Sequence, residues 1–133
     1  MLVEHARNVQ GIDDAVHEEW GVAGTRVVSL LSCSLVESEI DIDITPGTRL
    51  ERIYGTKCSR ERTHCNFGLA PDFESLATSG GLAISAIDGT GEVRAVERPD
   101  HPFFVATLYQ PQRTSRPDAP HPVFTAFIDA ITR

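Results

Sequence analysis

Three cysteines and a histidine are the side chains of this sequence most suited to bind a metal ion or to act in nucleophilic catalysis: Cys33, Cys58, Cys65 and His64. Structural zinc needs four ligands, which usually arrive in close pairs, and this spacing is missing here. His64 and Cys65 are neighbours in the chain, and neighbouring residues of a strand point to opposite faces. They are therefore poorly placed to share an ion or to form a thiol–imidazole pair. We predict no metal site and interpret the three thiols as buried and inert.

The other polar motifs have structural interpretations. His101 and His121 each precede a proline, where we expect them to cap turns. Residues 88–91, Asp-Gly-Thr-Gly, are followed by an apolar strand pattern and predict a hairpin turn, because a phosphate-binding loop is followed by a helix. Acids alternate with isoleucines in one segment, which predicts a solvated strand face in preference to a divalent-cation site; these acids are Glu39, Asp41 and Asp43. None of these motifs indicates a cofactor.

Length and charge bound the class of protein. The 133 residues fit one domain, 1–133, and 19 acidic against 12 basic residues give a net charge of −7. That balance argues against a nucleic-acid partner, which requires a basic surface. The sequence contains no apolar run long enough for a membrane span and no signal-peptide pattern at its start. The three cysteines are an odd number and lack the short spacing of a disulfide-rich scaffold, which favours a reducing compartment. We therefore expect a cytoplasmic protein without a membrane partner.

Hydrophobic periodicity predicts alternating helices and strands. The segment 11–25 is predicted to be a loop anchored by Trp20, and 26–34 a short buried strand. Thr48 is suited to cap a short helix that carries Leu50, Ile53 and Tyr54 inward. The expected helices are 2–10, 48–54, 71–76 and 121–131, and the expected strands are 26–34, 39–44, 57–67, 82–87, 92–96 and 103–109. This order predicts an α/β fold with a mixed sheet flanked by helices.

Motifs near both ends of the chain resemble CTP synthase. Residues 99–105, PDHPFFV, are followed by YQPQ at 109–112, TSRP at 114–117 and PHPVF at 120–124. The end of CTP synthase reads similarly, as P-D-H-P-W-F-V, Q-F-H-P-E, T-S-R-P and P-H-P-L-F. Residues 3–9, VEHARNV, resemble its I-E-x-A-R-N-V segment. The resemblance spans nearly the whole chain and is weakest over residues 21–60.

The resembling region of CTP synthase is its glutaminase domain, a class I glutamine amidotransferase with a Cys-His-Glu triad. The resemblance implies a flavodoxin-like three-layer fold and a single partial domain that lacks the N-terminal half. The family's nucleophile would fall about half a dozen residues before Met1. Its triad histidine falls on Gln110 and its triad glutamate on Gln112. A neutral amide cannot accept the thiol proton, so the resemblance implies a degenerate triad without glutaminase activity.

The resemblance also implies three substrate-binding candidates. Glu19 matches the residue that binds the amino group of the substrate. The family segment R-H-R-Y-E-V-N aligns on residues 63–69, which retain His64 and place Cys65 where an arginine would hold the substrate carboxylate. The family's G-G-T-M-R-L-G loop is replaced by residues 34–38. Recognition of glutamine is therefore expected to be damaged together with catalysis.

Three functional hypotheses follow. The first is a pseudoenzyme that acts as a binding or interaction module, with a glutamine-like small molecule as its possible ligand. The second is an enzyme with altered chemistry on such a molecule, using Cys65, His64 or Glu19. The third is a fragment of a longer amidotransferase whose N-terminal half carries the nucleophile. A sheet divided in this way exposes an edge, so we expect a homo-oligomer, a missing N-terminal half or a rearranged fold.

Overall fold

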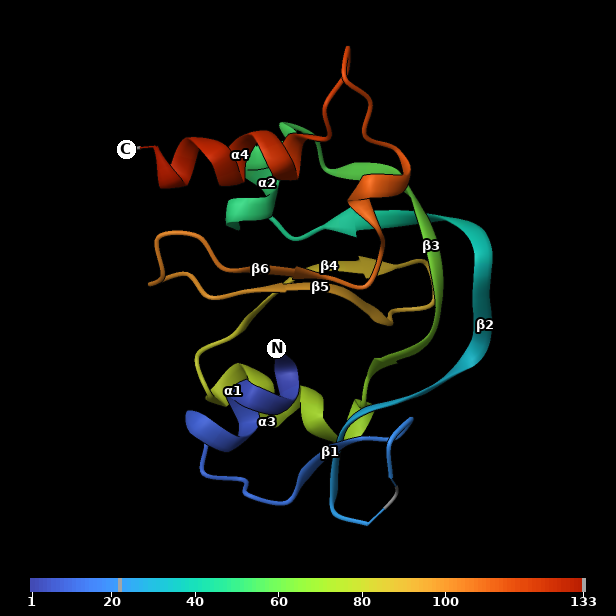
Figure 1. The fold of residues 1–133 in the computed structure, drawn as a ribbon, viewed down its shortest axis with the longest axis vertical. Helices are drawn as coiled ribbons and strands as arrows, with labels where there is room; N and C mark the ends of the chain where they lie inside the picture. The colour runs from blue at the N-terminus through green and yellow to red at the C-terminus, as the bar shows by residue number, and fades with distance from the viewer. Residues whose placement is uncertain (22, 133) are drawn as a thin grey trace.

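The structure is a computed structural model that describes residues 1–21 and 23–132. Helices lie on both sides of a mixed sheet (Figure 1). On one side are α1 (Leu2–Asn8) and α3 (Glu74–Ser79), and on the other are α2 (Arg49–Tyr54) and α4 (Pro122–Ile131). The prediction of an α/β fold with a mixed sheet flanked by helices is confirmed. None of the described helices is long and apolar enough to cross a membrane.

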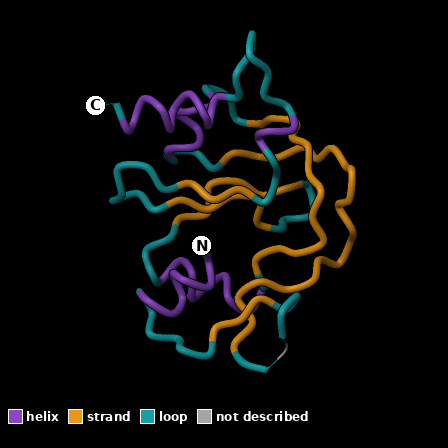
Figure 2. Tube along the Cα trace, in the orientation of Figure 1, coloured by secondary structure: helices purple, strands orange, loops and turns teal. Residues whose placement is uncertain are grey.

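The described strands form a sheet with the order β1-β2-β4-β5-β6 (Figure 2). The remaining strand, β3, also pairs with β2 but is not part of this order. β1 pairs in parallel with β2, whereas the pairings of β2 with β3 and β4, of β4 with β5, and of β5 with β6 are antiparallel. The strand bounds are β1 (Ala15–His17), β2 (Thr25–Ile44), β3 (Cys58–Leu69), β4 (Ala83–Asp88), β5 (Val93–Glu97) and β6 (Val105–Thr107).

β2 is one long strand where the sequence predicted two. It pairs with β3 along most of its length, with irregular register between Leu30 and Ser38. The two strands bend away together as a ribbon (Figure 1). Only Val27 and Val28 are buried in the first half, while Leu30 is 63% exposed. The prediction of a short buried strand at 26–34 was therefore wrong, because a two-stranded ribbon leaves much of its surface open to solvent.

Two apolar clusters hold the helices to the sheet. Phe73, Val27 and Val96 pack beneath α1 and α3, whereas Leu50 and Tyr109 belong to the cluster beneath α2 and α4. The alternating segment places Ile40, Ile42 and Ile44 in this second cluster, as its period predicted. The cap of α2 is also confirmed, since Thr48 Oγ1 accepts a hydrogen bond from the Glu51 amide at 3.2 Å.

Two further local predictions need correction. Trp20 does not anchor the 11–25 segment, because it is 82% exposed and that segment contains β1. β6 is shorter than the predicted strand at 103–109. The chain leaves β5 after Leu108 and joins β3, where the Gln110 amide donates to the Arg62 carbonyl at 2.9 Å. Apolar composition at 103–109 could not reveal this change of partner, because both settings bury apolar side chains.

Candidate site at the cavity beneath α1

A cavity of about 550 Å³ lies between α1 and the sheet. Its volume is in the range of small-molecule sites. Residues of α1, β1, β2, β3, β5 and β6 contribute to it, and most are apolar: Val28, Phe67, Leu69, Val93, Val96 and Ala106 are among them. The site can bury apolar groups, and its charged side chains, Glu4 and Arg7, come from α1.

Aromatic rings border this cavity on the β1 side. The His17 ring lies 5.0 Å from the Trp20 ring and 5.0 Å from the Phe67 ring, centroid to centroid. His17 Nδ1 accepts a hydrogen bond from the Glu19 amide at 3.2 Å. The proton of the neutral imidazole is consequently assigned to Nε2. In this arrangement His17 offers a hydrogen-bond donor, not a base.

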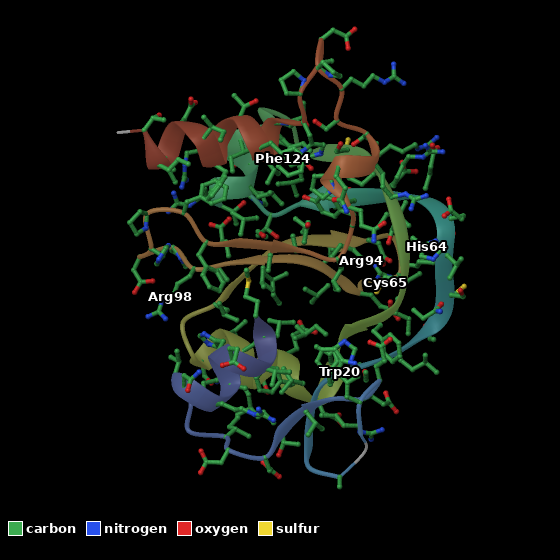
Figure 3. All side chains as sticks on the ribbon, in the orientation of Figure 1. Trp20, His64, Cys65, Arg94, Arg98 and Phe124 are labelled. Carbon is green, nitrogen blue, oxygen red and sulfur yellow. The ribbon has the colours of Figure 1, made fainter. Side chains whose placement is uncertain are left out.

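Cys65 lines the cavity, and His64 lies on the other face of β3 (Figure 3). The Cys65 thiol lies 3.3 Å from the Phe67 carbonyl oxygen and accepts from the Phe67 amide at 3.4 Å. Within residues 1–21 and 23–132, no imidazole or carboxylate hydrogen-bonds to this sulfur. The predicted separation of His64 from Cys65 is confirmed, and the thiol has no adjacent general base among the described residues.

His64 belongs to an exposed cluster with Glu37 and Arg113. His64 Nδ1 lies 2.9 Å from Glu37 Oε1, and Arg113 donates to the other carboxylate oxygen. The hydrogen bond from Arg113 lowers the pKa of Glu37, with a further contribution from His64. Glu37 has a φ of 50°, in the left-handed region. Glu37 and Arg113 could not be identified from the sequence, because their contact depends on the irregular β2–β3 pairing and on the 3-10 helix at Pro111–Arg113, far along the chain.

Gln110 and Gln112, which the resemblance predicts at the triad positions, lie where β6 passes to the 3-10 helix η2 (Pro111–Arg113). Gln110 is half-buried, and its backbone N–H donates a hydrogen bond to the Arg62 carbonyl of β3, whereas Gln112 is exposed. Glu19 is exposed and follows β1. The substrate-binding candidates are thus divided: Cys65 lies in the cavity, His64 on the outer face of β3, and Glu19 beside the aromatic border.

A buried polar network ties β3 to α2 and α4 on the opposite side of the sheet. Tyr54 Oη donates to Glu61 Oε1 at 2.8 Å, and it also lies 3.0 Å from Tyr109 Oη. His121 Nδ1 accepts from the Val123 amide at 3.2 Å, which leaves Nε2 to donate to Glu61 Oε2 at 3.2 Å. Burial alone would raise the pKa of Glu61, but the hydrogen bonds from His121 and Tyr54 outweigh it and lower that pKa. Burial raises the pKa of both tyrosines.

This network gives His121 a structural role. His121 caps the start of α4, where its side chain accepts from the Val123 amide. His101 accepts from the Phe103 amide at 3.2 Å in a turn, so both histidines have the capping role that was predicted. The sequence did not reveal the partnership with Glu61, because the two residues lie on separate elements. The network holds α2 and α4 on the sheet.

The thiols and acids of the described residues do not gather into a metal site. Across the described part of the chain, no group of three or more His, Cys, Asp or Glu side chains lies close enough together to hold an ion. Cys33 and Cys58 are exposed and Cys65 is half-buried, so the prediction of three buried thiols was wrong. The acidic face of β2 is solvated as predicted, and arginines of β3 pair with it, as in the 2.7 Å contact of Arg60 with Asp41. The predicted hairpin turn at residues 88–91 is confirmed, since it joins the antiparallel strands β4 and β5 and the Thr90 amide donates to the Asp88 carboxylate.

Comparison with known proteins explains this arrangement. No family model matches the chain. CTP synthase of Rhizobium meliloti (strain 1021) is 31% identical over 97% of this chain, and that of Aeropyrum pernix is 34% identical over 99%. The solved glutaminase domain of Trypanosoma brucei CTPS, with bound acivicin, superposes on 98% of the chain with a TM-score of 0.91 and 28% identity. The chain resembles the glutaminase domain of CTP synthase.

The glutaminase resemblance inferred from the terminal motifs is thereby confirmed. The matched part is limited: the chain spans 27% of the length of these two curated relatives and 55% of the solved glutaminase domain. The solved structure of a putative GMP synthase component from Thermoplasma acidophilum shares the fold at 13% identity, with a TM-score of 0.58 over 79% of the chain.

Proposed function

We propose that this glutaminase-like chain does not hydrolyse glutamine and acts as a binding or interaction module. The feature that supports this most directly is the pair Gln110 and Gln112, which the resemblance aligns with the triad histidine and glutamate. A second observation is that Cys65, the thiol of the cavity, has no base within hydrogen-bond distance in the described structure.

The chemistry of the two amides makes the expected loss of activity large. An ordinary thiol has a pKa of about 8.5 and needs a base or a nearby cation to supply thiolate at neutral pH. A positioned general base contributes roughly 10²–10⁴-fold in rate. Gln110 cannot accept the proton, and Gln112 carries no charge to stabilise an imidazolium. Restoring only one of the two triad residues would leave either the proton acceptor or the charge that stabilises the imidazolium missing.

The proposed module retains surfaces for binding. A glutamine-like small molecule is one candidate ligand, with Glu19 available to meet an amino group. Cys65 cannot replace a guanidinium, which binds a carboxylate through two parallel hydrogen bonds. We therefore expect weak binding of glutamine compared with an intact glutaminase. A further copy of the chain or a missing N-terminal half is the macromolecular partner that an exposed sheet edge would require, and the acidic net charge disfavours nucleic acid.

An altered enzyme is the alternative function. His17 and Cys65 line the same cavity, which favours it. The hydrogen bond from the Glu19 amide to His17 Nδ1 weighs against it, because the remaining ring nitrogen then carries the proton.

The test is to incubate the purified chain with glutamine and to measure glutamate and ammonia. Cys65→Ser is the informative variant, and Cys33→Ser is the matched control, since Cys33 is an exposed thiol outside the cavity. We expect no release above the uncatalysed rate from any of the three proteins. Release by the parent chain and the control that is lost in Cys65→Ser would contradict the proposal and favour the altered enzyme.

A further inference from the structure

Glu37 lies in a bulge of the β2–β3 ribbon. Leu35 of β2 pairs with Cys65 of β3 and Ser38 pairs with Thr63, so β2 carries one more residue than β3 between these pairs. Among the described residues other than glycine, Glu37 alone has a positive φ, at 50°. This backbone region is unfavourable for a residue with a side chain, and a bulge redirects the side chains that it carries. Such an outlier points to a contact that maintains it.

The bulge directs the Glu37 carboxylate to two cationic side chains on different elements. Its Oε1 lies 2.9 Å from His64 Nδ1 of β3, and its Oε2 accepts a hydrogen bond from Arg113 of η2. The next acid on this face behaves differently, because Glu39 lies 3.5 Å from Arg62 in a pair that stays within the ribbon. Glu37 therefore connects the ribbon to η2.

The middle of the ribbon has few other attachments to the body of the fold. Residues 29–41 of β2 have no described strand partner besides β3, because β1 pairs with β2 before this stretch and β4 pairs after it. The Ser32 hydroxyl binds the β4–β5 hairpin at 2.9 Å, and Leu35 packs against the cluster beneath α2 and α4. β3 is tied at Arg62 to the segment after β6, and its residues 64–67 follow that tie.

The contact between Glu37 and Arg113 is electrostatic and lies near solvent, since the Glu37 side chain is 61% exposed. The hydrogen bond from Arg113 lowers the pKa of Glu37, so the carboxylate is ionised at neutral pH. Counterions screen contacts between exposed charges. The attachment should therefore hold at low ionic strength and loosen in concentrated salt.

Cys65 is the group that such loosening would affect. It follows His64 on β3 and faces the cavity, on the opposite side of the strand (Figure 3). Cys65 is half-buried, whereas Cys33 and Cys58 are exposed. A movement of the ribbon away from η2 would carry His64 and Cys65 with it, and the Cys65 thiol would become more accessible.

We propose that Glu37 is an ionic strap: by binding His64 and Arg113 together, it holds the bulged ribbon against η2 and restricts access to the Cys65 thiol. Glu37 is a positioning residue, because it acts on Cys65 through β3. The inference goes beyond the proposed function, since the strap works whether or not the cavity holds a ligand.

The test measures alkylation of Cys65 by iodoacetamide, an uncharged reagent, followed by mass spectrometry. The protein carries Cys33→Ser and Cys58→Ser, so that Cys65 is its only thiol. Glu37→Gln removes the charge and keeps the size of the side chain, and it should raise the alkylation rate about threefold at low salt. Sodium chloride at about 1 M should raise the rate of the parent similarly and change that of Glu37→Gln little.

Two further variants separate the strap from a general effect of charge. Glu39→Gln is the matched control, because Glu39 is an exposed acid of the same strand whose partner lies within the ribbon. It should leave the alkylation rate unchanged. Arg113→Gln should act like Glu37→Gln, and the double variant should be no faster than either one, because both changes break the same contact.

Hydrogen exchange of the β4 and β5 amides shows whether the rest of the sheet stays folded in each variant. An unchanged alkylation rate in Glu37→Gln, or an equal increase in Glu39→Gln, would overturn the proposal. Addition of the two effects in the double variant would also overturn it. An increase accompanied by faster exchange throughout β4 and β5 would mean that the whole fold loosens, which contradicts a local strap.

Discussion

His5 shows how a single buried residue makes the stability of this chain depend on pH. Its side chain lies under α1 and the residue is only 5% exposed. Burial lowers the pKa of His5 below the ordinary value of 6.5, and the positive charge of Arg98 lowers it further. Protonation is therefore less favourable in the folded chain than in the unfolded one. By linkage, the stabilisation is complete above pH 6.5 and is lost as the pH falls toward the folded-state pKa.

We expect His5→Leu to reduce the loss of stability between pH 7.5 and about pH 5. Leucine carries no proton, so its contribution to the free energy of unfolding does not change over this range. Urea unfolding at several pH values measures the effect. His101→Gln is the control, because His101 is exposed and its replacement should preserve the pH dependence. An unchanged slope in His5→Leu would contradict the prediction.

Single elements are held in place by buried carboxylates as much as by apolar contacts. Glu97 of β5 accepts from the Arg49 amide at 2.7 Å and from the Leu50 amide at 3.0 Å, so it binds the first turn of α2. Glu61 of β3 joins α2 and α4 through Tyr54 and His121. Both helices depend on acids that are distant in the sequence, and α2 is too short to be stable alone.

Glu97→Ala should destabilise the chain by about 2 kcal/mol, because two amides at the start of α2 lose a charged acceptor. Denaturant unfolding measures this change. Glu51→Ala is a comparison on the same helix, since the Glu51 carboxylate binds the exposed Gly47 amide. An equal loss in the two variants would show that the buried carboxylate of Glu97 has no special role.

Glu61→Gln should cost more, about 3 kcal/mol at pH 7, because it leaves His121 and Tyr54 without their charged partner. The lowered pKa of Glu61 predicts the pH range of this contribution: it is present above the unfolded value of 4.5 and disappears as the pH falls through the folded-state pKa. The stabilities of parent and variant should therefore converge in acid. A constant difference down to pH 3 would refute this assignment.

Elements with strong local signals were predicted well from the sequence. Thr48 caps α2, the alternating isoleucines of β2 are buried, and the Asp88 turn joins β4 to β5. The length of β2, the existence of β1 and the end of β6 were missed, because each depends on a partner strand. In the site, the opposite orientations of His64 and Cys65 followed from strand geometry. His17, Glu37, Arg113 and Glu61 were not identified, because their contacts join segments far apart in the chain.

At the scale of the whole molecule, the structure contrasts well-packed clusters with the open cavity beneath α1. The clusters hold the helices on both sides of the sheet, and the cavity beneath α1 remains bordered by an exposed tryptophan. The same fold thus contains a stable framework and an apolar surface with room for a partner. This division predicts that large aromatic residues contribute very differently to stability according to where they lie.

Trp20→Ala should change the free energy of unfolding of the isolated chain by less than about 0.5 kcal/mol, because Trp20 is 82% exposed. Phe73→Ala, at 1% exposure in the cluster beneath α3, should cost about 4 kcal/mol. Trp20 is the only tryptophan in the sequence, so its fluorescence reports on the cavity alone. Acrylamide should quench it readily, because the indole is open to solvent. A loss above about 2 kcal/mol in Trp20→Ala would mean that the segment after β1 packs over the cavity in solution, which would contradict the prediction.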